Sequence, residues 1–198
     1  LPYWPASEAW PVCASCKAPL DFIMQLRTDA ARELFPGPMG VLVLLLCLRC
    51  RPFYDTAQRR FAVRRFAVSP DTPLLPALSV PLPPSPVASM ALDLRPIMDV
   101  RSGLEAVQAS SLSVAQRLLL LEDDACETRD KVGGFPAFID TPTVPPCPRC
   151  KERPKLLLQL NGRPEDGFVW AQDAPGRLFL FGCERDHEGE YALLVQSE

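Results

Sequence analysis

The sequence predicts an α+β, strand-rich protein with an internal duplication of a zinc-knuckle plus β-strand repeat. Three observations predict it: two matched sets of metal-ligand residues, one numbering offset that relates two stretches of the chain, and short apolar runs bounded by turn residues. Of the 198 residues, 47% are hydrophobic, which is enough to bury a core, and 23 are prolines, which disfavour long helices. The net charge of −3 gives no general attraction to nucleic acid or to acidic membranes.

The metal-ligand residues fall into two sets with the spacing of zinc knuckles. Each set begins with a Cys-x-x-Cys pair; the first ends in another such pair, and the second ends in one cysteine and the only histidine of the chain. Two residues between paired cysteines let a tight turn direct both sulfurs at one ion, and the distant pair completes a tetrahedron. The sequence therefore predicts two structural Zn2+ ions, with these ligands: Cys13, Cys16, Cys47 and Cys50 for the first, and Cys147, Cys150, Cys183 and His187 for the second.

The two sets belong to a longer internal similarity. An offset of 134 and, after an insertion of two residues, an offset of 136 carry the first copy onto the second. The matched pairs include Pro2 and Pro136, Cys13 and Cys147, Gln25 and Gln159, Gly40 and Gly176, and Cys47 and Cys183. His187 lies where a counterpart of Cys50 is needed. The recurring glutamines have two readings, a buried amide that bridges backbone groups or a contact with a ligand.

Apolar runs predict three strands in each copy. In the first copy they are residues 20–26, 39–47 and 58–68, and in the second copy residues 155–160, 177–182 and 191–196. The run at 58–68 repeats Arg-Arg-Phe-Ala-Val, which places Phe61 and Val63 on one face and Arg60, Arg64 and Phe66 on the other. Charged side chains commonly protect the edge of a sheet, so we expect an exposed or edge strand there.

The middle of the chain predicts a connector and a helix. Residues 69–86 include seven prolines and cannot form a helix or a central strand. Residues 90–94 suit a short strand, and apolar residues at three- and four-residue steps suit a helix at 104–122, with Ser113 as a cap that divides it. We therefore expect one compact body with three parts: a first zinc-knuckle and β repeat at 1–66, a connector and helical segment at 67–130, and a second repeat at 131–198.

Several motifs occur in an order that resembles a known family. They are Gly133-Gly134-Phe135-Pro136-Ala137-Phe138, then Cys147-Pro-Arg-Cys150, Leu157-Leu158-Gln159-Leu160 and the run from Gly176 to Cys183. This order resembles the YwqG-like family of mostly bacterial proteins and is similar to the N-terminal domain of eukaryotic programmed cell death protein 2. The resemblance covers residues 1–66 and 131–198. It departs in one place, because no Gly-Gly pair precedes Leu1-Pro2; Leu1 is not an initiator residue, so we expect the natural protein to begin upstream.

The resemblance implies a duplicated α+β fold and a role in binding protein. The eukaryotic relatives are understood as dedicated chaperones for a small-subunit ribosomal protein, whereas many bacterial members have no assigned activity. By analogy, the partner of this acidic chain would be another polypeptide, including a basic ribosomal protein.

Catalytic signatures are missing from the sequence. The only histidine is assigned to a metal, so a serine or cysteine nucleophile has no histidine base. No phosphate-binding glycine loop occurs, and four protein ligands leave neither zinc ion an open position for catalysis. Neither Cys-x-x-Cys pair opens a helix, as a reactive redox pair would, and Cys126 is a lone thiol of no expected importance. We therefore expect a protein that is not an enzyme.

The predicted function is that of a non-catalytic, zinc-stabilised protein-binding module, such as a dedicated chaperone or adaptor. The alternatives are an immunity or regulatory protein of a bacterial toxin system, a zinc-dependent enzyme, and an RNA-binding protein that uses Arg59, Arg60, Arg64 and Arg65. The thiol spacing favours the reducing cytoplasm over a secreted disulfide framework. The longest apolar stretch, residues 39–48, is half of the roughly 20 residues that a membrane helix requires, so no membrane role is expected.

Overall fold

The structure is a computed structural model that describes residues 2–32, 34–35, 40–50, 54–55, 57–69, 71, 130–139, 144–162, 176–185, 187 and 189–197. These residues form eight strands in two antiparallel sheets and one short 3-10 helix. The chain is therefore strand-rich with almost no helix in its described part. The predicted strand at 90–94, the predicted helix at 104–122 and nearly all of the predicted connector at 69–86 lie outside the described residues.

The first sheet consists of three strands in the order β1-β2-β4. They are β1 (Asp21–Arg27), β2 (Gly40–Leu46) and β4 (Phe61–Ala67), and the 3-10 helix η1 (Thr28–Ala31) follows β1. All three predicted strands of the first copy are confirmed, and β4 is the edge strand that the arginine repeat predicts. The first half of β4 is nevertheless buried, because Phe61 and Val63 face the core between the sheets.

The second sheet has five strands in the order β3-β8-β7-β6-β5. Its three long strands are β6 (Pro154–Asn161), β7 (Gly176–Cys183) and β8 (Tyr191–Ser197), which confirms the predicted strands of the second copy. Two short strands flank them, β3 (Tyr54–Asp55) on β8 and β5 (Lys131–Val132) on β6. The sequence does not predict these two, since two residues are too few to show an alternation of apolar and polar side chains.

The three long strands pair in the same register in both sheets. Asp21 pairs with Leu46 in the first sheet, and Lys155 pairs with Gly182 in the second, so the partners are related by the offsets 134 and 136 that relate the sequences. A register irregularity interrupts β1 between residues 22 and 24, and another interrupts β6 between residues 156 and 158. The correspondence in sequence is thus also a correspondence in hydrogen-bonded pairing and in the position of a bulge.

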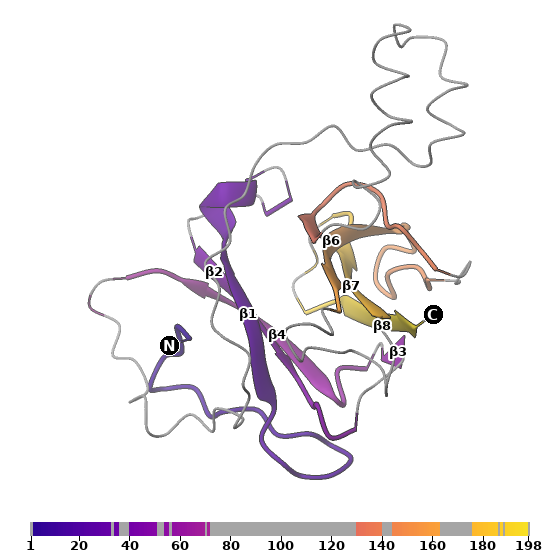
Figure 1. Cartoon of the computed structure of the whole chain (residues 1–198). Coiled ribbons are helices and arrows are strands. Elements are labelled where there is room, and N and C mark those ends of the chain that lie inside the picture. The colour runs from indigo at the N-terminus through magenta and orange to yellow at the C-terminus, as the bar shows by residue number, and fades with distance from the viewer. Residues whose placement is uncertain are drawn as a thin grey trace, which may run out of the picture.

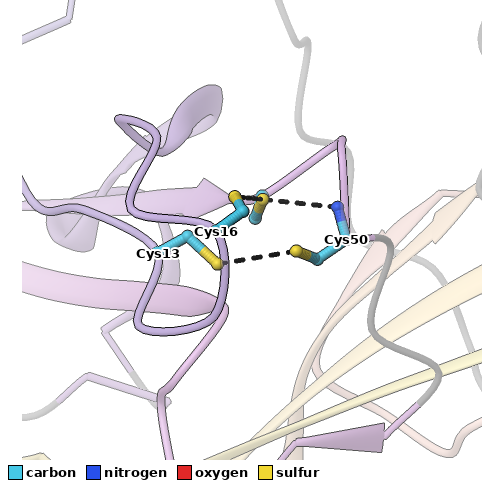
Figure 2. A group of neighbouring side chains, drawn as sticks. Cys13, Cys16 and Cys50 are labelled. Atoms are coloured by element: carbon cyan, nitrogen blue, oxygen red, sulfur yellow. Dashed lines mark hydrogen bonds between the residues drawn. The ribbon is translucent and has the colours of Figure 1, made fainter.

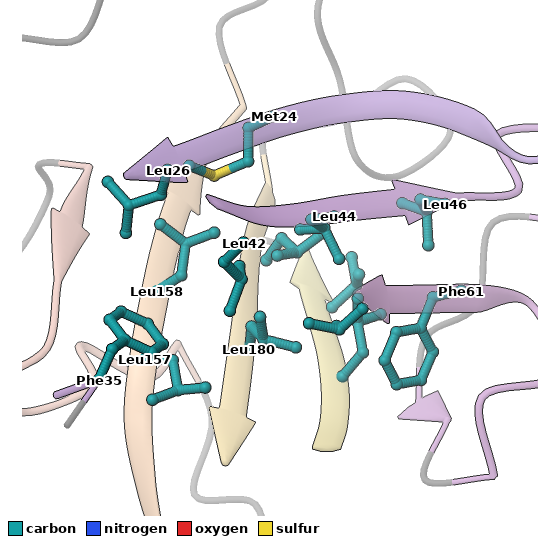
Figure 3. Packing of buried hydrophobic residues seen from close by; sticks show 14 residues of the cluster. Met24, Leu26, Phe35, Leu42, Leu44, Leu46, Phe61, Leu157, Leu158 and Leu180 are labelled. Atoms are coloured by element: carbon teal, nitrogen blue, oxygen red, sulfur yellow. The ribbon is translucent and has the colours of Figure 1, made fainter. Parts of the chain in front are cut away.

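The two sheets pack face to face around one apolar core (Figure 1, Figure 3). Alternate residues of β2 point into this core from one sheet, and Leu178 and Leu180 of β7 point into it from the other. Figure 3 shows the side chains of Leu42 and Leu44 directed toward the second sheet, where Leu158 and Leu180 lie, and Leu46 beside Phe61. Since side chains of both copies make up this core, neither sheet buries its inner face alone.

Each sheet also buries its outer face under the loop that leads to its cysteine pair. In the first sheet, Val43 and Leu45 pack beneath Trp4, which is 1% exposed. In the second sheet, Phe179 packs against Phe138, with ring centroids 5.2 Å apart. Trp4 and Phe138 are related by the offset of 134, so the two cover loops pack equivalent aromatic side chains against their sheets, Trp4 fully and Phe138 partly buried. The aromatic residues before the first cysteine pair are therefore packing residues.

Gln25 and Gln159 hold these cover loops against their sheets. Gln25 Oε1 accepts a hydrogen bond from Tyr3 N at 2.8 Å, and Gln159 Oε1 accepts one from Ala137 N at 2.9 Å. The side-chain amide oxygens of both glutamines therefore bind backbone groups of the chain, which is the structural role predicted for them as an alternative to ligand contact. The burial of the two differs, because Gln159 is 0% exposed whereas Gln25 is exposed.

This difference predicts unequal effects of equivalent substitutions. Gln159→Leu breaks a hydrogen bond whose acceptor is fully buried and leaves the partly buried Ala137 N–H without that acceptor, which is expected to lower the free energy of unfolding by about 1–3 kcal/mol. Gln25→Leu exposes its donor to water and is expected to cost less than about 1 kcal/mol. Urea denaturation of both variants measures the difference, and equal losses would contradict the buried role of Gln159.

Candidate metal centres

Each Cys-x-x-Cys pair lies in a tight turn built by backbone hydrogen bonds. In the first turn, Cys13 N donates to Ala18 O at 2.8 Å and Lys17 N donates to Cys13 O at 2.9 Å. In the second turn, Cys147 N donates to Glu152 O at 3.0 Å and Lys151 N donates to Cys147 O at 2.9 Å. Lys17 and Lys151 both have positive φ angles, of 60° and 64°, which close the two turns in the same way.

The first cluster brings together the four cysteines predicted for it. Cys13 and Cys16 lie in the turn, Cys47 follows directly after β2, and Cys50 lies in the next turn. Figure 2 shows the Cys13 and Cys50 sulfurs facing each other, 3.8 Å apart; the Cys16 and Cys47 sulfurs are 3.5 Å apart. Four sulfurs at the usual Zn–S distance are about 3.8 Å from one another in a tetrahedron, whereas disulfide-bonded sulfurs are about 2.05 Å apart.

The second cluster brings together the other four predicted residues. The Cys150 and Cys183 sulfurs are 3.4 Å apart, and His187 Nδ1 lies 3.5 Å from the Cys147 sulfur and 3.3 Å from the Cys183 sulfur. Sulfur and nitrogen ligands of one tetrahedral zinc ion are about 3.6 Å apart. Cys183 ends β7 as Cys47 follows β2, so each cluster joins a turn to the end of a central strand.

Both clusters have the composition and size of a four-ligand metal site. In each, the ligand atoms all lie within 4.8 Å of one another. Two of the four residues are buried in each cluster, the first cysteine of the turn and the cysteine at the strand end, and the other two are more exposed. Each of the two clusters can therefore hold a metal ion. Cys126 lies outside the described residues.

Backbone amides make the thiols of each cluster unequal. Burial alone would raise the pKa of Cys13, but the N–H groups of Cys16 and Ser15 donate to its sulfur and lower that pKa to about 7. At Cys147, burial likewise raises the pKa, but the N–H of Cys150 and the ring of His187 lower it to about 6. Burial raises the pKa of Cys47 to about 12. Each turn thus stabilises one thiolate, the charge state that binds a cation.

Further contacts around the clusters are not evident from the sequence. Cys50 N donates to the Cys47 sulfur at 3.4 Å, and Arg185 N donates to the Cys183 sulfur at 3.3 Å, so a backbone amide supports the strand-end ligand in both sites. Two exposed ion pairs, Arg149 with Glu190 at 2.9 Å and Arg185 with Glu152 at 2.8 Å, join the second turn to the segment around His187. No spacing rule predicts such pairs, because they depend on the folded path of the chain.

The arginine repeat in and just before β4 makes hydrogen bonds within the chain. Arg60 Nε donates to Ser15 Oγ at 3.3 Å, and Arg65 Nη2 donates to Phe35 O at 3.4 Å. Arg64 Nη1 donates to the carbonyl of Val63 at 3.0 Å. Three of the four guanidinium groups therefore make hydrogen bonds within the chain, to the first cysteine turn, to the segment after η1 and to β4 itself.

Comparisons with known proteins show the family of the chain but no activity. Within the described part of the chain, no helix has the length and apolar character that a membrane span requires. No match was found among curated proteins. Residues 1–180 match a family that is described as a domain of unknown function, DUF1963. This match includes six of the eight cluster residues and ends before Cys183 and His187. The chain belongs to the DUF1963 family.

Proposed function

We propose that the protein is a zinc-stabilised, non-catalytic module that binds another polypeptide. The observation that carries the zinc assignment is the pair of closed four-ligand clusters, Cys13, Cys16, Cys47 and Cys50, and Cys147, Cys150, Cys183 and His187. Thiolate and imidazole are ligands typical of structural zinc, and a tetrahedral site with four protein ligands leaves no position for water or substrate. Each ion would fasten a cover loop to the end of a central strand and so contribute to folding.

The equivalent registers, bulges and cysteine turns support an origin of the two copies by duplication. A duplicated fold with this order of motifs is also what the likeness to the YwqG-like family and to programmed cell death protein 2 implies. We infer from that likeness a role as a chaperone or adaptor, with a ribosomal protein as one candidate partner. The free thiols at Cys-x-x-Cys spacing favour the cytoplasm as its location.

Affinity capture tests the binding role. The tagged protein, purified with its zinc from its native host, is expected to retain one polypeptide in stoichiometric amount, identified by mass spectrometry. The matched control is the Cys13→Ser/Cys16→Ser double variant, which removes the first turn's ligands and is expected to release that partner. Recovery of nucleic acid in place of protein, or turnover of a small molecule by the zinc-loaded chain, would contradict the proposal.

The four arginines in and just before β4 distinguish protein binding from RNA binding. Replacement of Arg59, Arg60, Arg64 and Arg65 by glutamine removes four charges but keeps groups that can donate hydrogen bonds, so we expect partner capture to be unchanged. The measurement is the amount of partner retained per mole of variant, with RNA binding measured in parallel by filter retention. Loss of capture together with loss of RNA retention would assign the function to this strand.

A further inference from the structure

One segment between the two sheets contacts both candidate metal centres. It consists of residues 54, 55 and 57–60, and we call it the bridge segment. At its start, Tyr54 and Asp55 form β3 and pair with β8 of the second sheet (Figure 1). At its end it continues into β4 of the first sheet. The bridge segment therefore leads from the second sheet back to the first.

The end of the bridge segment holds both halves of the first metal site. Arg59 O accepts a hydrogen bond from Ala14 N of the cysteine turn at 2.7 Å. Arg60 O accepts one from Cys47 N, directly after β2, at 2.8 Å. Arg60 Nε also donates to Ser15 Oγ at 3.3 Å. Two adjacent carbonyls thus bind the turn and the strand-end ligand, so the position of the bridge segment depends on how these two parts of the site lie relative to each other.

The carboxylate of Asp55 fixes the shape of the bridge segment. Its Oδ1 accepts a hydrogen bond from Ala57 N at 2.9 Å, and its Oδ2 accepts one from Arg60 N at 2.8 Å. Asp55 is 8% exposed, and hydrogen bonds that are shielded from water are stronger than exposed ones. Gln58 lies between the two bound amides in the sequence, so a displacement of Arg60 also displaces Gln58.

The side chain of Gln58 makes the contact with the second metal site. Gln58 Nε2 donates to Gly189 O at 2.6 Å. Gly189 follows the predicted ligand His187 by two residues, and the N–H of Glu190 donates to His187 O at 3.2 Å. Glu190 also pairs with Arg149 of the second cysteine turn at 2.9 Å. The amide of Gln58 therefore binds the turn that carries the imidazole of the second site.

We propose, on the basis of the zinc-binding role proposed above, that Gln58 is a positioning residue that couples the two metal sites. When the first site is filled, its turn and Cys47 are fixed, and the bridge segment is held where Gln58 keeps the turn at His187 ready for coordination. The second site then binds zinc more tightly than it does when the first site is empty. By linkage, the second site raises the affinity of the first by the same factor.

NMR of the full chain loaded with cadmium-113 tests the coupling. Cd2+ takes thiolate and imidazole ligands, and a four-thiolate site and a three-thiolate, one-imidazole site give separate resonances. Competition with a chelator then gives the affinity of each site. Gln58→Ala is expected to weaken the second site by about three- to tenfold, the range that corresponds to one hydrogen bond.

The same substitution is then measured with the first site disabled by Cys47→Ser. Cys47→Ser alone is expected to weaken the second site by about three- to tenfold. The further change Gln58→Ala should then cost less than about twofold, because the bridge segment is already released from the first site. Cys16→Ser, at the exposed ligand of the turn, repeats the comparison with a smaller effect on the core.

Two variants of the bridge segment serve as controls. Gln58→Glu has the same length but lacks the N–H donor, and it should weaken the second site even though its negative charge favours a cation. Ala57→Ser keeps the backbone donor to Asp55 and should change neither affinity by more than about twofold.

Two bound ions together with no effect of Gln58→Ala, or with equal losses whether or not the first site is intact, would overturn the coupling and leave the zinc assignment standing. A chain that binds no metal at either site would contradict the proposed function as well.

Discussion

Cys47→Ser is expected to remove one of two zinc ions and to lower the free energy of unfolding by at least about 3 kcal/mol. This is a fraction of the roughly 10–16 kcal/mol that zinc contributes to isolated finger peptides, since the core between the sheets remains. Cys47 is 1% exposed and joins the end of β2 to the first cysteine turn, so its loss frees both the turn and the cover loop before it. Metal analysis and thermal unfolding measure the two effects.

Cys126→Ser is the matched control, because it also removes one thiol but belongs to neither predicted ligand set. It is expected to keep two zinc ions and to change the free energy of unfolding by no more than about 0.5 kcal/mol. Equal metal contents in the two variants would show that Cys47 is not a ligand.

Leu180→Ala is expected to destabilise the protein by about 2–5 kcal/mol without loss of metal. Leu180 is 0% exposed and lies in the core that both sheets share, so its truncation leaves a cavity between them. Val68→Ala, at a side chain that is 43% exposed, is the control and should cost no more than about 0.5 kcal/mol. Denaturant unfolding gives the stability, and a loss of zinc in Leu180→Ala would contradict the separate roles of the core and the metal sites.

The long strands could be predicted because apolar periodicity determines which side chains are buried. In β2 nearly every residue is apolar, and the structure uses both faces, with Leu44 directed into the shared core and Val43 beneath Trp4. The burial of both faces explains why that run has no polar alternation. The clusters could be predicted for a different reason, because thiols at this spacing have few roles other than metal binding or disulfide formation.

The contacts between the copies could not be predicted. Tyr54 and Asp55 belong to the first copy but pair with β8 of the second. Lys155 of the second copy donates from Nζ to Leu34 O of the first at 3.0 Å. These contacts depend on how two sheets meet in space, which a pattern along one strand does not encode. The ion pairs around His187 are unpredictable for the same reason.

Metal analysis of the purified chain tests the central claim most directly. Protein purified under reducing conditions without added metal, weighed by native mass spectrometry, is expected to carry two zinc ions per chain. A strong chelator should remove both and abolish the near-ultraviolet circular dichroism of Trp4 and Trp10, which pack with ring centroids 4.9 Å apart beside the first site. A chain that is fully folded with no bound metal, or whose cluster cysteines are joined in disulfides, would contradict the account.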